Sequence, residues 1–410
     1  MTLSAVANNA LLSFNRGGVD SGVLFRNDDQ FSNFISLSSI FQSGLNFNGS
    51  LFNGLFVNTN GNVTFEGGLS QFTPNVIGNG AQTIIAPFWG DVDTRGLPQG
   101  NVYWDFDPVR DSFIVTWDHV GYFSNQVDKL NTFQLELHDE GLGNFEIIYR
   151  YTDINWTTGS ASGGVNGLGG TVARTGFSSG NGLSIDLAQS GNQAAMLNLE
   201  NILGNTGVAG VWQFEVQSGG LHIVFGAEDN TFFGGLLADF CDGGDGNDVE
   251  HGNAGNDDLN GGNGDDDLFG DLGSDNLNGG AGADDLNGGA GRDFMTGGAG
   301  HDVFIFIAVI DTGRSKSSRD QILDFRHRVD DVNVHEIDAN SSRFGNQNFK
   351  FIGQDDFHHV KGEMRYEKFD NAGKKHDFTL ISGDINGDGR ADFQIELKGL
   401  INLTKGDFVL

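Results

Sequence analysis

The chain has almost no cysteine and no long apolar run. Its 410 residues include one cysteine, Cys241, which excludes an intramolecular disulfide. No stretch reaches about 18 apolar residues, so the sequence predicts no membrane-spanning helix. Residues 1–12 carry neither a basic segment nor a long apolar segment, so we expect no N-terminal secretory signal peptide.

Positive charge and proline are also scarce. Lys and Arg number 23 against 55 Asp and Glu, which gives a net charge of −32 and a pI near 4.3. Such a chain repels nucleic acids and anionic lipid, so neither is expected as a partner. Only 4 residues are Pro, whereas 64 are Gly and 35 are Phe. Short aromatic and β-branched runs between Gly and Asn predict an all-β protein, and its length suits two or three domains.

Catalytic motifs are absent or out of context. A zinc protease needs His-Glu-x-x-His on a helix, but the His335-Glu336 pair is followed by no second histidine at that spacing. Residues 176–180 satisfy Gly-x-Ser-x-Gly, but the residues after them begin no helix, which a nucleophile elbow requires. We therefore predict no catalytic residue.

A nine-residue repeat dominates the second half of the chain. The pattern is Gly-Gly-x-Gly-x-Asp-x-U-x, where U is usually a large apolar residue, and residues 279–287 are a clean copy. Its aspartate recurs eight times, at Asp239, Asp248, Asp257, Asp266, Asp275, Asp284, Asp293 and Asp302. A disordered Gly/Asp linker would not keep an apolar residue two places after these aspartates. The pattern therefore predicts a calcium-binding parallel β-roll.

Each position of the repeat has a physical role. Glycines turn the backbone through positive φ and bring carbonyl groups close to an ion, and aspartate supplies the hard oxygen that calcium prefers. The U residue packs between the two sheets, and because Glu250 is a poor interior residue, we expect the first two copies to be irregular. The predicted calcium ligands here are Gly244, Asp245, Gly246, Asp248, Gly255, Asp257, Gly262, Gly264, Asp266, Gly273, Asp275, Gly280, Gly282, Asp284, Gly289, Gly291, Asp293, Gly298, Gly300 and Asp302.

The repeats are strongly acidic and resemble the RTX, or haemolysin-type, calcium-binding repeats. Residues 234–305 hold 16 acidic residues and one basic residue, a net charge of −15. Without calcium these carboxylates repel one another, so we expect calcium to control folding. The resemblance implies that two nonapeptides make one turn and that an ion lies between the loops of repeats n and n+2. By that rule about five good sites are expected.

Residues 306–410 resemble the C-terminal region of the serralysin-type proteins. The resemblance runs through residues 320–325, 362–366 and 383–393 and ends at Asp407-Phe408-Val409-Leu410. An acidic residue followed by an apolar triplet matches that family's uncleaved C-terminal signal. This implies a type I ABC exporter as a partner and an extracellular location. Such an exporter passes unfolded, reduced chains, which suits a chain with one cysteine.

A loop in this region has two interpretations. Asp384, Asn386, Asp388 and Asp392 alternate as in the first half of an EF-hand calcium loop. However, Ile395 stands where that loop has its bidentate Glu. Either these four residues bind calcium, or Asn-Gly and Asp-Gly form a tight turn.

Residues 1–217 predict an antiparallel β domain with its own core. Alternation in 132–137 places Phe133, Leu135 and Leu137 on one face of a half-buried strand. From about residue 30 the region resembles the NIDO domain, an extracellular nidogen-like module, most specifically through Ala-Pro-Phe-Trp-Gly-Asp-Val-Asp-Thr-Arg at 86–95. The resemblance implies a role in cell–matrix adhesion.

Asp91 and Asp93, with Arg95 nearby, leave two possibilities open. The carboxylates form an internal salt bridge with the arginine, or they bind a cation.

The predicted organisation is an antiparallel β domain at 1–217, a linker at 218–233, a parallel β-roll at 234–305 and a β-rich C-terminal cap and secretion region at 306–410. The predicted function is a secreted calcium-binding protein that adheres to a matrix, surface or glycan ligand. The alternative is a secreted hydrolase of glycans or proteins with its active site in the N-terminal domain. Two carboxylates about 5–10 Å apart in a deep pocket would favour a glycosidase.

Overall fold

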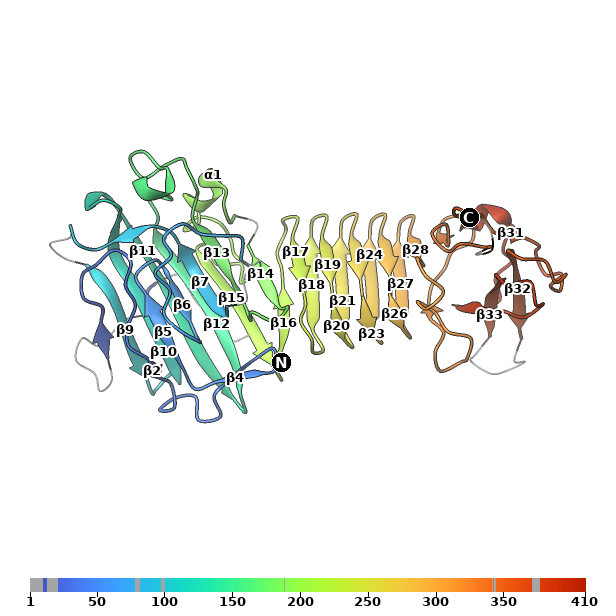
Figure 1. Cartoon of the computed structure of the whole chain (residues 1–410), viewed down its shortest axis with the longest axis horizontal. Helices are drawn as coiled ribbons and strands as arrows, with labels where there is room; N and C mark the ends of the chain where they lie inside the picture. Colours follow the sequence, from blue (N-terminus) through green and yellow to red (C-terminus); the bar gives the residue numbers. More distant parts are fainter. Residues whose placement is uncertain are drawn as a thin grey trace. The chain divides into compact units, whose positions relative to one another are not determined.

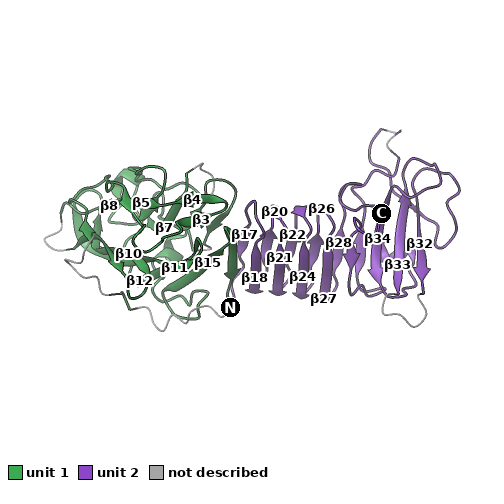
Figure 2. Ribbon diagram, turned by 90° about the horizontal axis from the view of Figure 1, so that it is seen from below, with its two compact units in different colours: residues 1–226 green, residues 227–410 purple. Residues whose placement is uncertain are grey.

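The computed structural model describes residues 10–12, 21–77, 82–96, 100–187, 189–340, 342, 344–370 and 377–410. The chain forms two compact units, residues 1–226 and 227–410 (Figure 2). Regular structure in both units is almost entirely strand, so the prediction of an all-β protein is confirmed (Figure 1). The described helices are single turns, α1 (Gln193–Met196) and two 3-10 turns at Ser160–Ser162 and Lys405–Asp407. None of them is long enough to cross a membrane.

Antiparallel sheets build the first unit. One sheet contains β1 (Gly22–Val23), β8 (Val92–Asp93), β9 (Asn101–Asp107), β10 (Ser112–Tyr122), β11 (Gln126–Gly141), β12 (Asn144–Asp153), β15 (Val211–Gln217) and β16 (Gly220–Val224). Strands of the second sheet are β2 (Ile35–Ser36), β5 (Gly54–Asn58), β6 (Asn62–Thr64), β7 (Ile84–Trp89), β13 (Arg174–Ser178) and β14 (Ser184–Asp186). A separate hairpin joins β3 (Leu45–Phe47) to β4 (Ser50–Phe52).

Aromatic side chains fill the space between these two sheets. The ring of Phe88 in β7 lies 5.2 Å from that of Phe133 in β11. Farther along, Phe177 of β13 lies 5.1 Å from Phe214 of β15. All four rings are at most 1% exposed, and Trp117 stacks on Phe133. Because each ring buries a large apolar area, these contacts give the unit its own core.

Residues 131–137 in the middle of strand β11 are buried on both faces, so the prediction of a half-buried strand at 132–137 is wrong. Its apolar residues face the core as expected, but Gln134 and Glu136 on the other face are also at most 1% exposed. Gln134 accepts a hydrogen bond from the backbone N–H of Leu12 (3.0 Å) and donates one to its carbonyl (3.1 Å). Glu136 forms an ion pair with Arg150 at 2.8 Å. The alternation of apolar and polar residues in 132–137 identified the face that packs on the core. It carried no information about the segments that cover the opposite face.

The Glu136–Arg150 pair leads to a stability prediction. Arg150→Ala should destabilise the first unit by about 3–5 kcal/mol, because it removes the buried positive charge beside Oε2 of Glu136, while Ser112 and Arg110 contact only Oε1. Arg110 is the matched control, since it contacts the same carboxylate at 3.4 Å but is 47% exposed. Its replacement by Ala should cost about 0–1 kcal/mol. Urea unfolding followed by tryptophan fluorescence measures both, and equal effects would contradict the assignment.

Parallel strands stacked every 18 residues form the β-roll of the second unit (Figure 1). One sheet contains β18 (Phe240–Asp245), β21 (Asp258–Asn263), β24 (Asn276–Ala281), β27 (Phe294–Ala299) and β29 (Gln321–Ile322). The opposite sheet contains β17 (Thr231–Phe233), β19 (Val249–His251), β22 (Asp267–Phe269), β25 (Asp285–Asn287), β28 (Val303–Ile305), β30 (Asp331–Asn333) and β35 (Phe408–Val409). Short strands β20 (Ala254–Gly255), β23 (Leu272–Gly273) and β26 (Ala290–Gly291) lie in the turns.

The U residues form the interior of the roll. All eight are at most 2% exposed. In one sheet Leu259 aligns with Leu277, which aligns with Met295, and in the other Leu268 aligns with Leu286. The nine-residue spacing therefore corresponds to half a turn, because each sheet receives every second U residue.

Glu250 occupies an interior U position without disturbing the roll. It is 1% exposed and lies in register between Phe232 and Leu268. Burial, reinforced by nearby carboxylates, raises the pKa of Glu250 to about 8. The side chain is therefore mainly neutral at pH 7, which removes the cost of burying a charge. The expectation that the first two copies are irregular is wrong, because β18 and β19 already pair in register.

Residues 218–233 hold strands where the sequence analysis placed a linker. β16 pairs antiparallel with β15 and belongs to the first unit. β17 pairs parallel with β19 and begins the roll. Asn230 and Phe232 stand nine residues before Asp239 and Cys241, so they form an unrecognised copy of the repeat in which Asn replaces Asp. The boundary between the units is therefore corrected to 226/227.

The C-terminal region continues the roll. Its own strands are β31 (Lys350–Phe351), β32 (Glu363–Phe369), β33 (Phe378–Asp384) and β34 (Phe393–Lys398). β32, β33 and β34 pair antiparallel in sequence order. β34 joins β29 in parallel, and β35 joins β30 so that Phe408 aligns with Val332. Both sheets of the roll thus continue into strands of this region.

Candidate calcium sites

The repeat aspartates form a ladder that links successive turns of the roll. From Asp257 to Asp302, the Oδ1 atom of each accepts a hydrogen bond from the backbone N–H of the aspartate 18 residues earlier, as from Asp248 to Asp266 at 2.8 Å and from Asp266 to Asp284 at 3.0 Å. Asp248 accepts the equivalent bond from Asn230. Oδ2 is buried and has no hydrogen-bond partner among the described residues at Asp248, Asp257, Asp266, Asp275, Asp284 and Asp293. A buried carboxylate oxygen without a partner is unfavourable, and a cation would satisfy it.

Glycines make the space in which these oxygens lie. A Cβ added at Gly282, which has a φ of +151°, would lie 1.7 Å from the carbonyl oxygen of Gly264 one turn earlier. One added at Gly279 would lie 2.4 Å from Oδ2 of Asp284. Carboxylate and carbonyl oxygens are the donors that calcium prefers, so the residues present fit calcium. These observations support the predicted ligand set, which stays a prediction residue by residue.

The carboxylates of the ladder are poorly solvated. Burial, and beyond it the charge of neighbouring aspartates, raises the pKa of Asp257 and Asp284 to about 7 and that of Asp293 to about 8. Protons therefore occupy part of the ladder at neutral pH when no cation is bound. A divalent cation between the turns favours the charged form and reverses this preference.

A pH dependence follows from these raised pKa values. An aspartate whose folded pKa lies above its ordinary value of 3.8 stabilises the fold when protonated, and this contribution is lost as pH rises through about 7 to 8. The calcium-free roll should therefore be more stable at pH 5 than at pH 8. Because protons on the ladder stabilise the calcium-free fold, the calcium concentration at half-folding should fall as the pH is lowered from 8 to 6. Calcium titrations followed by circular dichroism at several pH values test this, and a pH-independent midpoint would contradict it.

The ladder extends beyond the nonapeptide repeats, which the sequence analysis missed. Asp320 accepts from the N–H of Asp293 at 2.9 Å, and Asp330 accepts from that of Asp302 at 3.4 Å. Oδ2 of Asp320 also lacks a partner, and burial raises the pKa of Asp320 to about 9. Asp320-Gln-Ile and Asp330-Asp-Val keep the Asp-x-U signal, but these aspartates follow their partners by 27 and 28 residues instead of 18, which broke the spacing.

Two predicted ligands have other partners. Asp302 forms an ion pair with Arg326 at 3.1 Å, so an arginine lies at that end of the ladder. Asp245 is exposed and accepts a hydrogen bond from the side chain of Asn263 at 2.6 Å. Neither carboxylate therefore resembles those in the middle of the roll, whose Oδ2 atoms are buried and have no hydrogen-bond partner among the described residues.

The loop at 384–392 is built as a turn. Both carboxylate oxygens of Asp384 accept backbone N–H groups, from Gly387 at 2.7 Å and from Gly389 at 2.8 Å. Asp392 accepts from the N–H groups of Ile385 and Asn386. Because backbone donors already occupy these oxygens, the geometry supports the turn and gives no support to a calcium site at Asp384, Asn386, Asp388 and Asp392.

The structure separates Asp91 from Asp93. Asp93 forms an ion pair with Arg95 at 2.6 Å. Burial raises the pKa of Asp93, but hydrogen bonds from the side chain and backbone of Arg95 and from the backbone of Asn125 outweigh burial and hold this pKa below its ordinary value. Asp91 instead groups with Asp28 and Asp29. The salt-bridge alternative therefore applies to Asp93.

Possible catalytic groups in the first unit are engaged in structural contacts. Ser178 ends β13 in a hairpin, and its Oγ accepts a hydrogen bond from the N–H of Gly180 at 3.1 Å. A cavity of about 100 Å³ beside it is lined by apolar and amide side chains such as Trp89, and none of its described lining residues is a carboxylate. The first unit therefore offers no glycosidase-like pair in that cavity.

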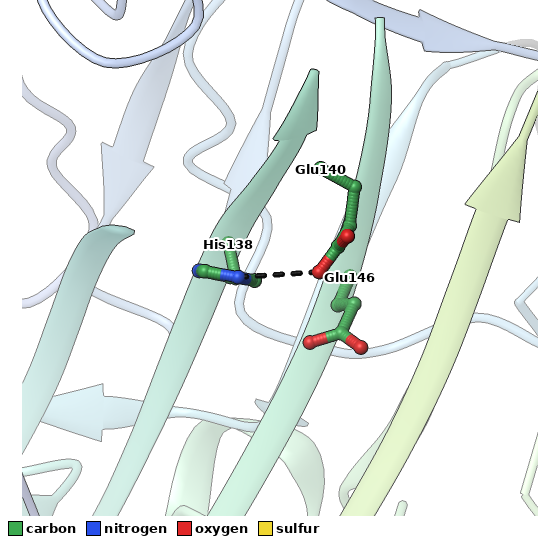
Figure 3. A group of neighbouring side chains, drawn as sticks. All are labelled: His138, Glu140 and Glu146. Atoms are coloured by element: carbon green, nitrogen blue, oxygen red, sulfur yellow. Dashed lines mark ion pairs between the residues drawn. The ribbon is translucent and has the colours of Figure 1, made fainter. Parts of the chain in front are cut away.

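A second group of polar side chains lies on β11 and β12 (Figure 3). His138 Nε2 lies 3.2 Å from Glu140 Oε1, and the carboxylate of Glu146 accepts a hydrogen bond from Gln213 at 2.7 Å. Since these groups bond to one another or to the sheet, we assign no ligand to them.

Family comparisons agree with this division of the chain. The nidogen-like domain matches residues 53–112 and 104–218, the RTX calcium-binding nonapeptide repeat matches 226–250, and the serralysin C-terminal region of peptidase M10 matches 256–410. The chain combines a nidogen-like domain with RTX repeats and a serralysin-type C-terminal region. RTX nonapeptide repeats bind calcium, so the predictions of these families and of calcium as the bound ion are confirmed.

Curated relatives share only part of the chain. Alpha-tectorin of Mus musculus is 34% identical over 189 residues, which is 40% of this chain and 9% of that protein. Nidogen of Drosophila melanogaster is 28% identical over 239 residues, 52% of this chain and 17% of that protein. The chain thus spans a small fraction of these relatives.

Solved structures with local similarity are the R3 and R2 subunits of AlgE6, a mannuronan C5-epimerase of Azotobacter vinelandii. They are 24% and 21% identical, cover 45% and 46% of this chain and 78% and 91% of their own, and have TM-scores of 0.21 and 0.22. Scores this low do not establish a shared overall fold. The RTX repeats, the serralysin-type region and the extracellular relatives together point to a secreted protein.

Proposed function

We propose that this protein is a secreted, calcium-dependent adhesion protein. Its nidogen-like domain binds a matrix, surface or glycan ligand, and its roll folds when it meets external calcium. The observation that carries the proposal is the ladder of buried, unpartnered carboxylates in the same chain as a nidogen-like domain. Its relatives alpha-tectorin and nidogen support an adhesive rather than an enzymatic role.

A binding screen tests the adhesive role. The full chain and residues 227–410 alone are applied to arrays of glycans and matrix proteins, with calcium and with chelator. Binding should require residues 1–226, because the nidogen-like domain lies there. Binding by residues 227–410 alone, or hydrolysis of an array component, would contradict the proposal.

Export is proposed to use the C-terminal segment Asp407–Leu410 through a type I exporter. In the folded chain this segment is held in the roll: Phe408 is 8% exposed, and fully buried Asp407 accepts from the N–H of Arg328 at 2.9 Å. A folded roll would therefore hide the segment from an exporter. Low calcium inside the cell keeps the roll unfolded and the segment accessible, and calcium outside folds it.

One substitution separates export from folding. Val409 is 40% exposed, so Val409→Asp should leave calcium-dependent folding unchanged but remove most of the secreted protein. Val329, also 40% exposed, provides the control Val329→Asp, which should be secreted normally. Immunoblots of the medium and of the cells measure the fraction of each variant that is secreted. Normal secretion of both Val409→Asp and a chain lacking 407–410 would contradict type I export.

A further inference from the structure

Three aspartates of the first unit converge, although they are far apart in sequence. Asp28 and Asp29 lie in the loop between β1 and β2, and Asp91 lies between β7 and β8. One carboxylate oxygen of each lies within 4.8 Å of those of the other two. This cluster is distinct from the ladder of the roll, which belongs to the other unit.

Two oxygens of this cluster are buried without a partner. Asp91 is 2% exposed, and its Oδ2 has no hydrogen-bond partner among the described residues. Oδ1 of Asp28 is also buried and has no hydrogen-bond partner among the described residues. A Cβ added at Gly159 would lie 2.2 Å from Oδ2 of Asp91, so only glycine leaves room for that oxygen. A buried carboxylate oxygen without a donor carries an uncompensated desolvation cost, which points to a missing cation.

The surrounding groups compensate only part of the negative charge. Arg95 contacts Asp28 at 2.8 Å but also pairs with Asp93 at 2.6 Å, so one positive charge is shared between two carboxylates. Asp29 receives a neutral hydrogen bond from the side-chain amide of Asn60 at 2.9 Å. Burial, and then the charges of Asp29, Asp28 and Asp93, raises the pKa of Asp91 to about 7, although a backbone hydrogen bond from Ala161 favours the charged form.

Hydrogen bonds from neighbouring segments position the backbone around the cluster. The side-chain oxygen of Asn60 accepts from the N–H of Val92 at 3.0 Å, and the carbonyl of Asp91 accepts from the N–H of Phe123 at 3.1 Å. Asp91 is therefore held in place by two neighbouring segments. The Asp28–Asp29 loop reaches it through Asn27, whose N–H donates to the Thr94 hydroxyl at 2.8 Å and whose carbonyl accepts from the Thr94 N–H at 2.9 Å.

We propose that Asp28, Asp29 and Asp91 bind a calcium ion in the nidogen-like domain. Carboxylate oxygens are hard donors, and calcium accepts irregular oxygen shells completed by backbone carbonyls or water, whereas Mg²⁺ demands a small regular octahedron. The ion ties the Asp28–Asp29 loop to the turn between β7 and β8. Calcium then acts on both units, folding the roll and fastening one loop of the domain that we assign to adhesion.

Hydrogen exchange of the full chain, read by mass spectrometry, tests this site and the roll together. In calcium, peptides covering 24–31 and 88–95 should exchange more slowly than in chelator, and peptides of the repeats serve as the internal positive control. Asp91→Asn keeps the size of the side chain but removes its charge. It should abolish the calcium effect at 24–31 and 88–95 and preserve the effect in the repeats.

Further variants keep the test decisive. Asp29→Asn, at a partly exposed position, should give the same loss if Asp91→Asn fails to fold. Asp111→Asn removes an exposed carboxylate of the same unit and should behave as wild type. The proposal is overturned if calcium protects the repeats but not 24–31 in the wild type, or if both cluster variants keep the full effect. Equal protection by Mg²⁺ alone would overturn the assignment to calcium.

Discussion

Removal of calcium should unfold the roll and leave the first unit folded. Residues 234–305 carry a net charge of −15, and the buried carboxylates of the ladder face one another with unpartnered oxygens. A site with calcium at about ten times its dissociation constant adds about 1.4 kcal/mol, so about five sites add about 7 kcal/mol. This is comparable to the whole stability of a domain, about 5–15 kcal/mol.

Far-UV circular dichroism of residues 227–410, titrated from chelator into millimolar calcium, measures this change. A large gain of β signal is expected with calcium, and little with sodium chloride at matched ionic strength. A spectrum that is the same in chelator and in calcium would contradict the prediction. In the full chain, tryptophan fluorescence reports the first unit separately, because all five tryptophans lie there.

Asp266→Asn should have opposite effects with and without calcium. An asparagine keeps the oxygen that accepts the N–H of Asp248 at 2.8 Å but removes a buried charge. In chelator, where the wild-type roll is expected to be unfolded, the variant should keep at least as much β signal as the wild type, since repulsion in the ladder falls. In calcium it should be less stable, because a neutral amide is a weaker calcium ligand than a carboxylate.

The matched control for this prediction is Asp267→Asn. Asp267 is the next residue in the chain and is exposed, so its replacement should change neither condition by much. Far-UV circular dichroism of each variant in chelator and urea unfolding in calcium give the four comparisons. Destabilisation by Asp266→Asn in both conditions would show that the carboxylate has a purely structural role.

The sequence predicted those features that repeat locally. The mostly apolar residue two places after each aspartate correctly marked the interior, and the resemblance to the RTX repeats implied the 18-residue stacking that the strands show. Asp320 and Asp330 escaped detection because insertions broke the spacing while the chain resumed the same ladder. Glu250 misled the analysis because its charge is largely lost on burial, which residue type alone does not reveal.

Features that depend on contacts between distant segments could not be predicted from local sequence patterns. The burial of Gln134 depends on Leu12, more than a hundred residues away, and local alternation cannot report such a contact. Asp91 was considered with Asp93 because they are neighbours in sequence, but the fold groups it with Asp28 and Asp29. In the loop at 384–392 the local pattern suggested a site that the geometry does not support. The side-chain oxygens alternate as in a calcium loop, but Asp384 and Asp392 accept hydrogen bonds from backbone N–H groups instead.

The most direct test is a crystal structure of the calcium-bound protein with anomalous scattering recorded to locate the ions. Anomalous peaks should lie between the turns of the roll, about 2.3–2.6 Å from carboxylate oxygens of the ladder and from glycine carbonyls. Asp266 and Asp284 in the middle of the roll should contribute Oδ2, the atom that lacks a hydrogen-bond partner. A folded roll with no peak beside these aspartates would contradict the account.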